Sequence, residues 1–459
     1  MSDIAIGALC MVGSLVLIQT GMHIGVALML LSFLGVWTIK GLAIAGKLLA
    51  SSAATSIASE VFGVIPLFVI MGLLVSSTGM GRDTFDVASL MLRRIRGGLG
   101  ISTVAANTVF AACTGTSIAS ASVFTKVAVP EMVRHGHTPG FSVGVVAGSS
   151  VLGMLIPPSL LMIIFGVIAN TSIGDLFKSG IVPGIVLAAA FCLTILLLGY
   201  FREHFVFADP KAQLDYRGPL HGAAWWIVLA KFLPISVLVA VVLGGIYGGF
   251  FTPTEAGAAG ALAAFLLALV RRILARMLGG DTASELTLRK FWEVALETGR
   301  VTAAICFLLM AAMLYAQMLT LSGLPYAVGQ WLESAELSFP LVLLGYLIVV
   351  VLMGCFLDSL SIMLILLPFI LPVIDGFGIN LIWFGLITII AIEIGLLTPP
   401  LGIAVYVVKA NLDDQRITPW EIFKGTFPMT ITMVIVLGLC VFFPWLSLVL
   451  VGRANWNWW

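Results

Sequence analysis

The segment that decides the fold is Cys113–Pro158, which reads CTGTSIASASVFTKVAVPEMVRHGHTPGFSVGVVAGSSVLGMLIPP. It recurs without a gap 242 residues later, at Cys355–Pro400, as CFLDSLSIMLILLPFILPVIDGFGINLIWFGLITIIAIEIGLLTPP. Most of the identical positions are Gly, Pro or Ser, which bend or break a membrane helix. Two corresponding, interrupted apolar segments are typical of the binding site of a secondary transporter, so the sequence predicts a protein that moves a solute. The eight identical pairs among the 46 positions are Cys113/Cys355, Ser117/Ser359, Pro130/Pro372, Gly136/Gly378, Gly153/Gly395, Leu155/Leu397, Pro157/Pro399 and Pro158/Pro400.

Composition places the chain in a membrane. Its 459 residues are 60% hydrophobic and only 10% charged, with a mean hydropathy of +1.14, whereas soluble proteins carry about 25% charged residues. Apolar runs long enough to cross a hydrocarbon core of about 30 Å recur from end to end. The chain has neither an HExxH motif nor a Walker A motif, so we expect no enzyme and no ATP hydrolysis.

The distribution of basic residues predicts the topology. Two apolar stretches, 99–131 and 339–372, are interrupted in the middle, and we interpret them as hairpins that enter and leave on one side. With both termini outside, all of the 23 Lys and Arg except Lys40, Lys47, Lys178 and Arg453 then face the cytoplasm, as the positive-inside rule requires. The ten predicted crossings are residues 4–19, 22–39, 61–78, 139–169, 181–200, 228–247, 256–276, 297–321, 381–410 and 427–451.

The same topology makes the two halves an inverted repeat. We therefore predict an all-α polytopic membrane protein with two re-entrant hairpins and two broken helices. Amphipathic segments at Leu42–Ser59 and Ser284–Leu296 are expected to lie along the membrane surface. The predicted parts are 1–97 (scaffold helices and arm), 98–201 (first hairpin and broken helix), 202–231 (cytoplasmic linker), 232–338 (scaffold helices and arm) and 339–459 (second hairpin, broken helix and last helix).

The first interrupted stretch contains small and hydroxylated residues at membrane depth. Thr114, Gly115, Thr116 and Ser117 are predicted to form a hairpin tip near the midplane, because non-helical backbone survives there only beside protein or a watery cavity. Freed carbonyls at such a tip favour a cation, and helix N-termini favour an anion. The alternative is close helix packing through small residues.

Each diproline must break the helix that contains it. The carbonyls of residues 153–156 and 395–398 then lose their helical partners, and hard oxygen ligands of that kind suit a desolvated Na⁺. Two breaks, each beside a hairpin tip, predict two Na⁺ sites related by the repeat.

The second interrupted stretch, Gly354–Ser361, contains the acidic residue Asp358. An acid at that depth is functional by default: it could orient the tip, ligate the cation or meet a solute hydroxyl. The alternative, compatible with these, is a cap on the second helix of the hairpin. Glu393 aligns with Val151 of the first half and could face a polar cavity or bind a helix end.

The motifs resemble the large membrane (M) subunit of TRAP (tripartite ATP-independent periplasmic) transporters, of the ion-transporter superfamily. The residues that carry the resemblance are Ala111–Ser122, Pro130–Met132, Leu152–Ser159 and Gly395–Gly402. It implies an elevator mechanism in the bacterial inner membrane, in which a transport domain slides against a scaffold and carries an organic acid with Na⁺. It also implies two partners besides membrane lipid: a separate small four-helix membrane subunit and a periplasmic substrate-binding protein.

The residues expected to act follow from these constellations, and no organic cofactor is expected. The alternatives are a stand-alone Na⁺/dicarboxylate symporter of the same superfamily, or a membrane-embedded enzyme or assembly factor. The sequence does not name the solute. Predicted solute-binding residues are Thr114, Thr116, Ser117, Ser149, Pro157, Ser159, Asp358 and Thr398. Predicted Na⁺ ligands are Thr114, Gly115, Ser117, Gly153, Ile156, Asp358, Ser361, Gly395 and Thr398.

Overall fold

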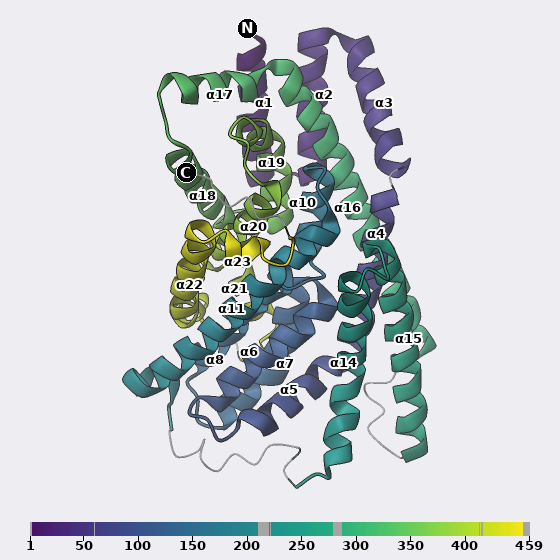
Figure 1. Ribbon diagram of the computed structural model, residues 1–459, viewed down its shortest axis with the longest axis vertical. Helices are drawn as coiled ribbons and strands as arrows, with labels where there is room; N and C mark the ends of the chain where they lie inside the picture. The colour runs from purple at the N-terminus through teal and green to yellow at the C-terminus, as the bar shows by residue number, and fades with distance from the viewer. Residues whose placement is uncertain are drawn as a thin grey trace.

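The chain folds into a tall bundle of helices (Figure 1). The computed structural model describes residues 2–58, 60–209, 220, 222–278, 287–412, 414 and 416–452. The predicted all-α class is confirmed in these ranges. The inverted orientation of the two halves and the elevator motion stay predictions.

The first half contains eleven α-helices, and a short helix follows it. They are α1 (Asp3–Gln19), α2 (Ile24–Lys40), α3 (Leu42–Ala58), α4 (Val64–Ser77), α5 (Met80–Leu92), α6 (Gly98–Thr114), α7 (Ser117–Arg134), α8 (Pro139–Ser150), α9 (Leu152–Leu155), α10 (Leu160–Ile168), α11 (Ile173–Phe201) and α12 (Glu203–Val206), with a 3₁₀ turn at Glu60–Gly63.

The described helices of the second half begin within the predicted linker. They are α14 (Trp225–Tyr247), α15 (Pro253–Leu278), α16 (Leu288–Ser322), α17 (Leu324–Ser334), α18 (Phe339–Gly354), α19 (Ser359–Asp375), α20 (Leu381–Leu397), α21 (Ile403–Ala410), α22 (Pro419–Phe442) and α23 (Trp445–Leu448). Of the predicted linker 202–231, residues 210–219 and 221 lie outside the described ranges, and the stretch from Trp225 on is already helical.

The helix bounds of the two halves follow the sequence repeat. The hairpin helices α7 and α19 begin at Ser117 and Ser359, which differ by 242 residues, and the broken helices begin at Pro139 and Leu381, again 242 apart. Gly136 and Gly378, which follow the hairpins, both have positive φ, 84° and 65°. A left-handed backbone conformation favours glycine, which explains that identity.

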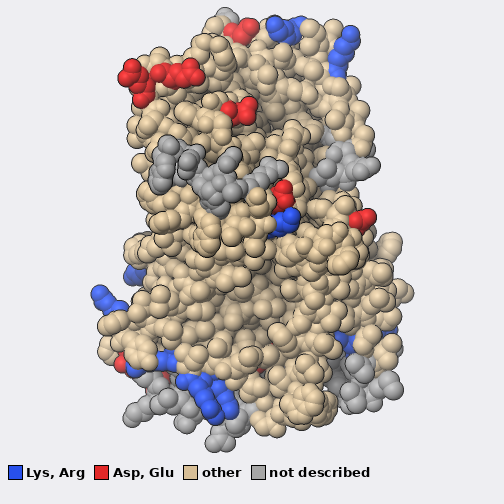
Figure 2. Space-filling model, viewed as in Figure 1, with Lys and Arg blue, Asp and Glu red and all other residues tan. Residues whose placement is uncertain are grey.

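The helices have the dimensions expected for a multi-pass membrane protein. By length and composition, five described helices could each cross a membrane, or seven spans if each bent pair is one span. The shorter predicted crossings fall on apolar helices of 10–17 residues. On the face shown in Figure 2, most charged side chains lie toward the two ends, a few lie near mid-height, and the band below these is largely uncharged.

Both predicted surface arms are helical where they are described. α3, which covers the first arm up to Ala58, packs against α2 and α16. The described part of the second arm is the start of the 35-residue helix α16. That either arm lies along the membrane surface stays a prediction. Two other helices change direction: α5 is bent by 62° from α4, and α17 runs across the upper left of Figure 1.

Two groups of helices form the bundle. In the first group, α2 packs on α16, and α4 packs on α15 and α16. In the second, α8 of the first half crosses α22 of the second so closely that a Cβ at Gly144 would overlap the backbone of Gly425. Thr194 of α11 and Thr432 of α22 also share a hydrogen bond of 2.7 Å between their hydroxyls. Hairpin and broken-helix elements of both halves therefore pack as one body.

Charged groups fix α5 to the first group. The Lys231 ammonium of α14 lies 3.1 Å from the Asp83 carboxylate and 2.6 Å from that of Asp86. The Arg271 guanidinium of α15 lies 2.6 Å from Asp83. These partly buried pairs connect α5 to α14 and α15. Shortly after α5, the chain turns at Gly97 (φ 73°) into the first hairpin.

A buried polar chain holds the first hairpin to its broken helix. The Asn107 amide of α6 donates to the Ser149 hydroxyl of α8 at 2.5 Å and accepts from the Ser120 hydroxyl of α7 at 2.6 Å. All three side chains are at most 1% exposed. Buried hydrogen bonds of this kind fix the arrangement of the elements they join, because a partner left alone there is costly.

We expect Asn107→Leu to lower the free energy of unfolding by about 1–3 kcal/mol, because it leaves two buried hydroxyls without their partner. Thr108→Val is the matched control, since the Thr108 hydroxyl bonds only the Val104 carbonyl of its own helix. Thermal unfolding in detergent measures both. Equal stability of the two variants would contradict the holding role of Asn107.

Candidate functional site

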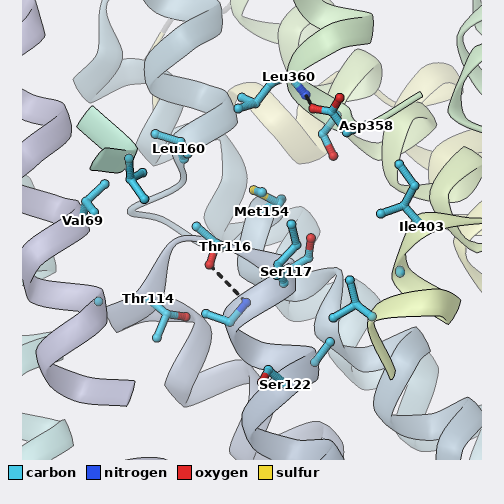
Figure 3. Close-up of a pocket in the computed structure, with 18 of the residues that line it drawn as sticks. Val69, Thr114, Thr116, Ser117, Ser122, Met154, Leu160, Asp358, Leu360 and Ile403 are labelled. Atoms are coloured by element: carbon cyan, nitrogen blue, oxygen red, sulfur yellow. Dashed lines mark hydrogen bonds between the residues drawn. The ribbon is translucent and has the colours of Figure 1, made fainter. Parts of the chain in front are cut away.

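A cavity of about 490 Å³ lies where the two hairpin tips meet α4 and α16 (Figure 3). Its walls come from α4 (Val69, Gly72 and Leu73), from α16 between Val301 and Leu308, and from the two tips: Thr114, Thr116, Ser117, Ile118, Ala119, Ala121, Ser122, Asp358, Ser359 and Leu360. Residues of α21, with Met154 and Leu160 of the first broken helix and Leu396 of the second, also line it. The cavity therefore touches both halves and both groups of helices.

The first tip is a tight turn between α6 and α7. Gly115 adopts φ 64°, a conformation that few other residues adopt, and ends α6. Thr116 then caps α7, and its hydroxyl accepts from the Ala119 amide at 3.4 Å (Figure 3). Ser117 follows as the first residue of α7 and is 4% exposed.

At the second tip, the equivalent residue also caps the helix that follows. Asp358, 242 residues after Thr116, caps α19 and accepts from the amides of Leu360 and Ser361 at 3.1 and 3.3 Å. The Ser361 hydroxyl donates to the other carboxylate oxygen. The capping role considered for Asp358 is therefore confirmed, and a role in ligating a cation stays a prediction.

Each tip is joined to the helix break of its own half by a backbone hydrogen bond. After Pro157–Pro158, the Leu160 amide donates to the Gly115 carbonyl at 3.1 Å. After Pro399–Pro400, the Leu401 amide donates to the Cys355 carbonyl at 3.2 Å. Both diprolines are cis. The non-helical backbone of the tips and breaks thus satisfies part of its own hydrogen-bonding need, as the membrane interior requires.

A glycine at the same position of each half allows this contact. A Cβ at Gly153 would lie 2.6 Å from the Thr116 carbonyl oxygen, and one at Gly395 would lie 2.6 Å from the Cα of Gly354. Any side chain would push the tip away from the break. These two glycines are an identical pair of the repeat, and close backbone approach is their physical reason.

The structure brings only some of the predicted site residues into the cavity. Thr114, Thr116, Ser117 and Asp358 line it. Outside its lining, Ser149 bonds Asn107, and the Ser159 hydroxyl caps α10 and donates to the Met154 carbonyl at 2.5 Å. The remaining predicted residues, also outside the lining, lie at the tip turns or helix breaks: Gly115, Gly153, Ile156, Pro157, Ser361, Gly395 and Thr398.

Sequence reasoning missed three contributions to the site. Ser359 lines the cavity, and its identity with Ser117 was the available signal. The α4 and α16 residues are ordinary apolar side chains that give no signal. The Ser122 hydroxyl donates to the Asn411 side chain at 2.8 Å and joins the first hairpin to the second broken helix, a pairing that the repeat does not contain.

The family of the chain follows from comparison with known proteins. A family described as "Tripartite ATP-independent periplasmic transporter, DctM component" matches residues 11–446. The chain belongs to this family. It is thus a DctM-like large TRAP subunit, a transporter permease and not an enzyme, as the resemblance in sequence indicated.

Individual relatives support the same family. The C4-dicarboxylate TRAP transporter large permease protein DctM of Pseudomonas aeruginosa is 32% identical over 82% of this chain and 85% of its own length. The sialic acid TRAP transporter large permease protein SiaM of Vibrio cholerae is 31% identical over 84% and 85%. The crystal structure of the YdaH transporter of Alcanivorax borkumensis shares the fold, with a TM-score of 0.59 at 14% identity over 89% of this chain and 90% of that one.

The close contact between tip and break gives a direct test. Gly354→Ala places a methyl group against Gly395, so we expect it to reduce solute uptake by tenfold or more in proteoliposomes. Gly345→Ala, on the same helix but with no atom within 4 Å of its Cβ position, should transport like the wild type. Equal uptake by both variants, at equal protein content, would show that the contact is not needed.

Proposed function

We propose that this DctM-family subunit couples the uptake of an organic acid to the inward flow of Na⁺ by an elevator movement. The observation that carries the proposal is the cavity bounded by two capped hairpin tips, each bonded to its own helix break and facing the scaffold. The solute class rests on the organic acids named for the two relatives.

The lining of the cavity suits an anion that arrives with cations. The first turns of α7 and α19 line it, so the positive ends of two helix dipoles face the solute. Among its lining residues the charged side chain is Asp358, an acid. An organic acid therefore depends on helix N-termini and bound cations for charge balance, and the carbonyls at the tips and breaks are the ligands we assign to two Na⁺.

The packing supports movement as two bodies. Hairpins and broken helices are joined across the halves by Ser122–Asn411 and by the crossing of α8 and α22. The scaffold presents apolar side chains of α4 and α16 to the cavity. Apolar surfaces without directional bonds slide past one another at low cost, which suits an elevator.

The family implies the assembly. We propose that a periplasmic binding protein delivers the solute and that a small four-helix membrane subunit supports the scaffold, in the inner membrane with both termini periplasmic. A stand-alone symporter is the second candidate, and uptake without any binding protein would favour it.

The coupling ion is tested by uptake into proteoliposomes with the cognate binding protein and a panel of organic acids. We expect uptake to require external Na⁺, with a Hill coefficient above one because two sites must fill. Choline replaces sodium as the control. Undiminished uptake in choline would exclude Na⁺ coupling.

The elevator is tested by distances between spin labels in a variant without native cysteines. Leu262→Cys on α15 and Ile185→Cys on α11 place labels on exposed positions of the two bodies. We expect their distance distribution to shift between the Na⁺-bound and the Na⁺- and solute-bound states. A pair within the scaffold, Leu262→Cys with Leu30→Cys, should not shift. Fixed distances for both pairs under all conditions would contradict the elevator.

A further inference from the structure

A carboxylate that none of the sites above uses is enclosed between the two tips. Glu393 lies on the second broken helix, α20, and is 1% exposed. One of its oxygens, Oε1, accepts from the Ser359 hydroxyl at 3.3 Å. The other, Oε2, is buried and has no hydrogen-bond partner among the residues that the structure describes.

In its ionised form, the buried Glu393 carboxylate needs a positive partner. In the part of the chain that the structure describes, the ion pairs of lysine, arginine and histidine involve other acids, so none neutralises this carboxylate. A buried carboxylate with one hydroxyl donor and one oxygen left unpaired is strongly unfavourable. Such a group in a membrane protein marks a functional site by default.

The surroundings of Glu393 are those of a cation ligand. The hydroxyls of Ser117 and Ser359, from the first residues of α7 and α19, both lie within its reach. These two serines line the cavity, and Glu393 lies outside the lining, 3.3 Å from the Ser359 hydroxyl. The carboxylate is therefore separated from the cavity by one lining hydroxyl.

The spacing fits one ion held by neighbouring oxygens. Metal–oxygen distances of about 2.4 Å at right angles place adjacent ligands about 3.4 Å apart. The Ser359 hydroxyl and Glu393 Oε1 are separated by 3.3 Å. One carboxylate with neutral hydroxyls balances a single positive charge, whereas Ca²⁺ takes six to eight oxygens and usually several carboxylates.

We propose that Glu393, with Ser117 and Ser359, binds a monovalent cation between the two hairpin tips, in addition to the two Na⁺ of the proposed function, on which this inference rests. The matching position of the first half is Val151, so the chain has one such site and not a pair. The ion joins ligands from both halves and therefore holds the tips together when the transport domain moves.

Binding of radioactive Na⁺ to purified protein, measured by a scintillation proximity assay, tests the proposal without transport. We expect E393Q, which keeps the shape and removes the charge, to bind one Na⁺ fewer per chain than the wild type. Ser150→Ala is the matched control: Ser150 is buried on the first broken helix and bonds only the Ala147 carbonyl of its own helix. This control should bind as many Na⁺ as the wild type.

Ser359→Ala provides a second variant in case E393Q does not fold. It removes one neutral ligand and should weaken the affinity of one Na⁺ several-fold, while the stoichiometry at saturation stays unchanged. If E393Q, or Ser359→Ala in its place, binds Na⁺ with the stoichiometry and affinity of the wild type, the Glu393 site is wrong and the two-site proposal stands. If the wild type binds no Na⁺, both proposals are wrong.

Discussion

The structure depends on how the backbone groups freed at two diproline breaks are satisfied inside a membrane. Proline donates no hydrogen bond and ends the helical ladder, and hydrocarbon supplies no water in its place. Each break therefore needs a second piece of non-helical backbone beside it, and each hairpin tip is that piece. The Leu160 amide reaches the Gly115 carbonyl, and the Leu401 amide reaches the Cys355 carbonyl. A tip and its break are thus obligatory partners, and neither is stable at that depth alone.

This partnership explains why glycine occurs where the two pieces touch and why the halves still differ elsewhere. Gly153 and Gly395 bring tip and break within backbone contact in both halves. Behind that contact, the first half uses the polar chain centred on Asn107, where the aligned residue of the second half is Val349. The first half also fixes α5 through Asp83 and Asp86 to basic residues of α14 and α15. The two halves therefore share the contact between tip and break, whereas the groups that support it differ.

Local chemistry made the tips and breaks predictable from sequence. Gly, Pro and Asp interrupting apolar runs have few interpretations at membrane depth, and the duplication removed most of the ambiguity. Orientation was not predictable, because a hydroxyl in an apolar helix does not reveal which face is occupied. Ser149 was predicted to bind solute, yet it bonds Asn107 outside the cavity lining. The lengths of individual helices were also not predictable from the sequence. Residues 42–77 and 288–322 are segments of similar length, but the first is interrupted by the 3₁₀ turn at Glu60–Gly63, and the second is one continuous helix.

Electrostatics then constrains the order in which ligands bind. Asp358 lines the cavity, and Glu393 contacts the lining residue Ser359. In their ionised forms, these two acids give the empty cavity a potential that opposes an organic acid. The N-termini of α7 and α19 offset only part of this, since each helix end carries about half an elementary charge. On the proposed function, cations bound at the tips reverse the sign of the potential that an incoming carboxylate meets. They also hold in place the backbone that forms the walls of the cavity. A solute that binds well only after the cations is coupled to them by linkage, because each ligand raises the affinity of the other by the same factor. On the proposed function, coupling in this chain therefore follows from an acidic cavity that needs cations before it can accept an acid.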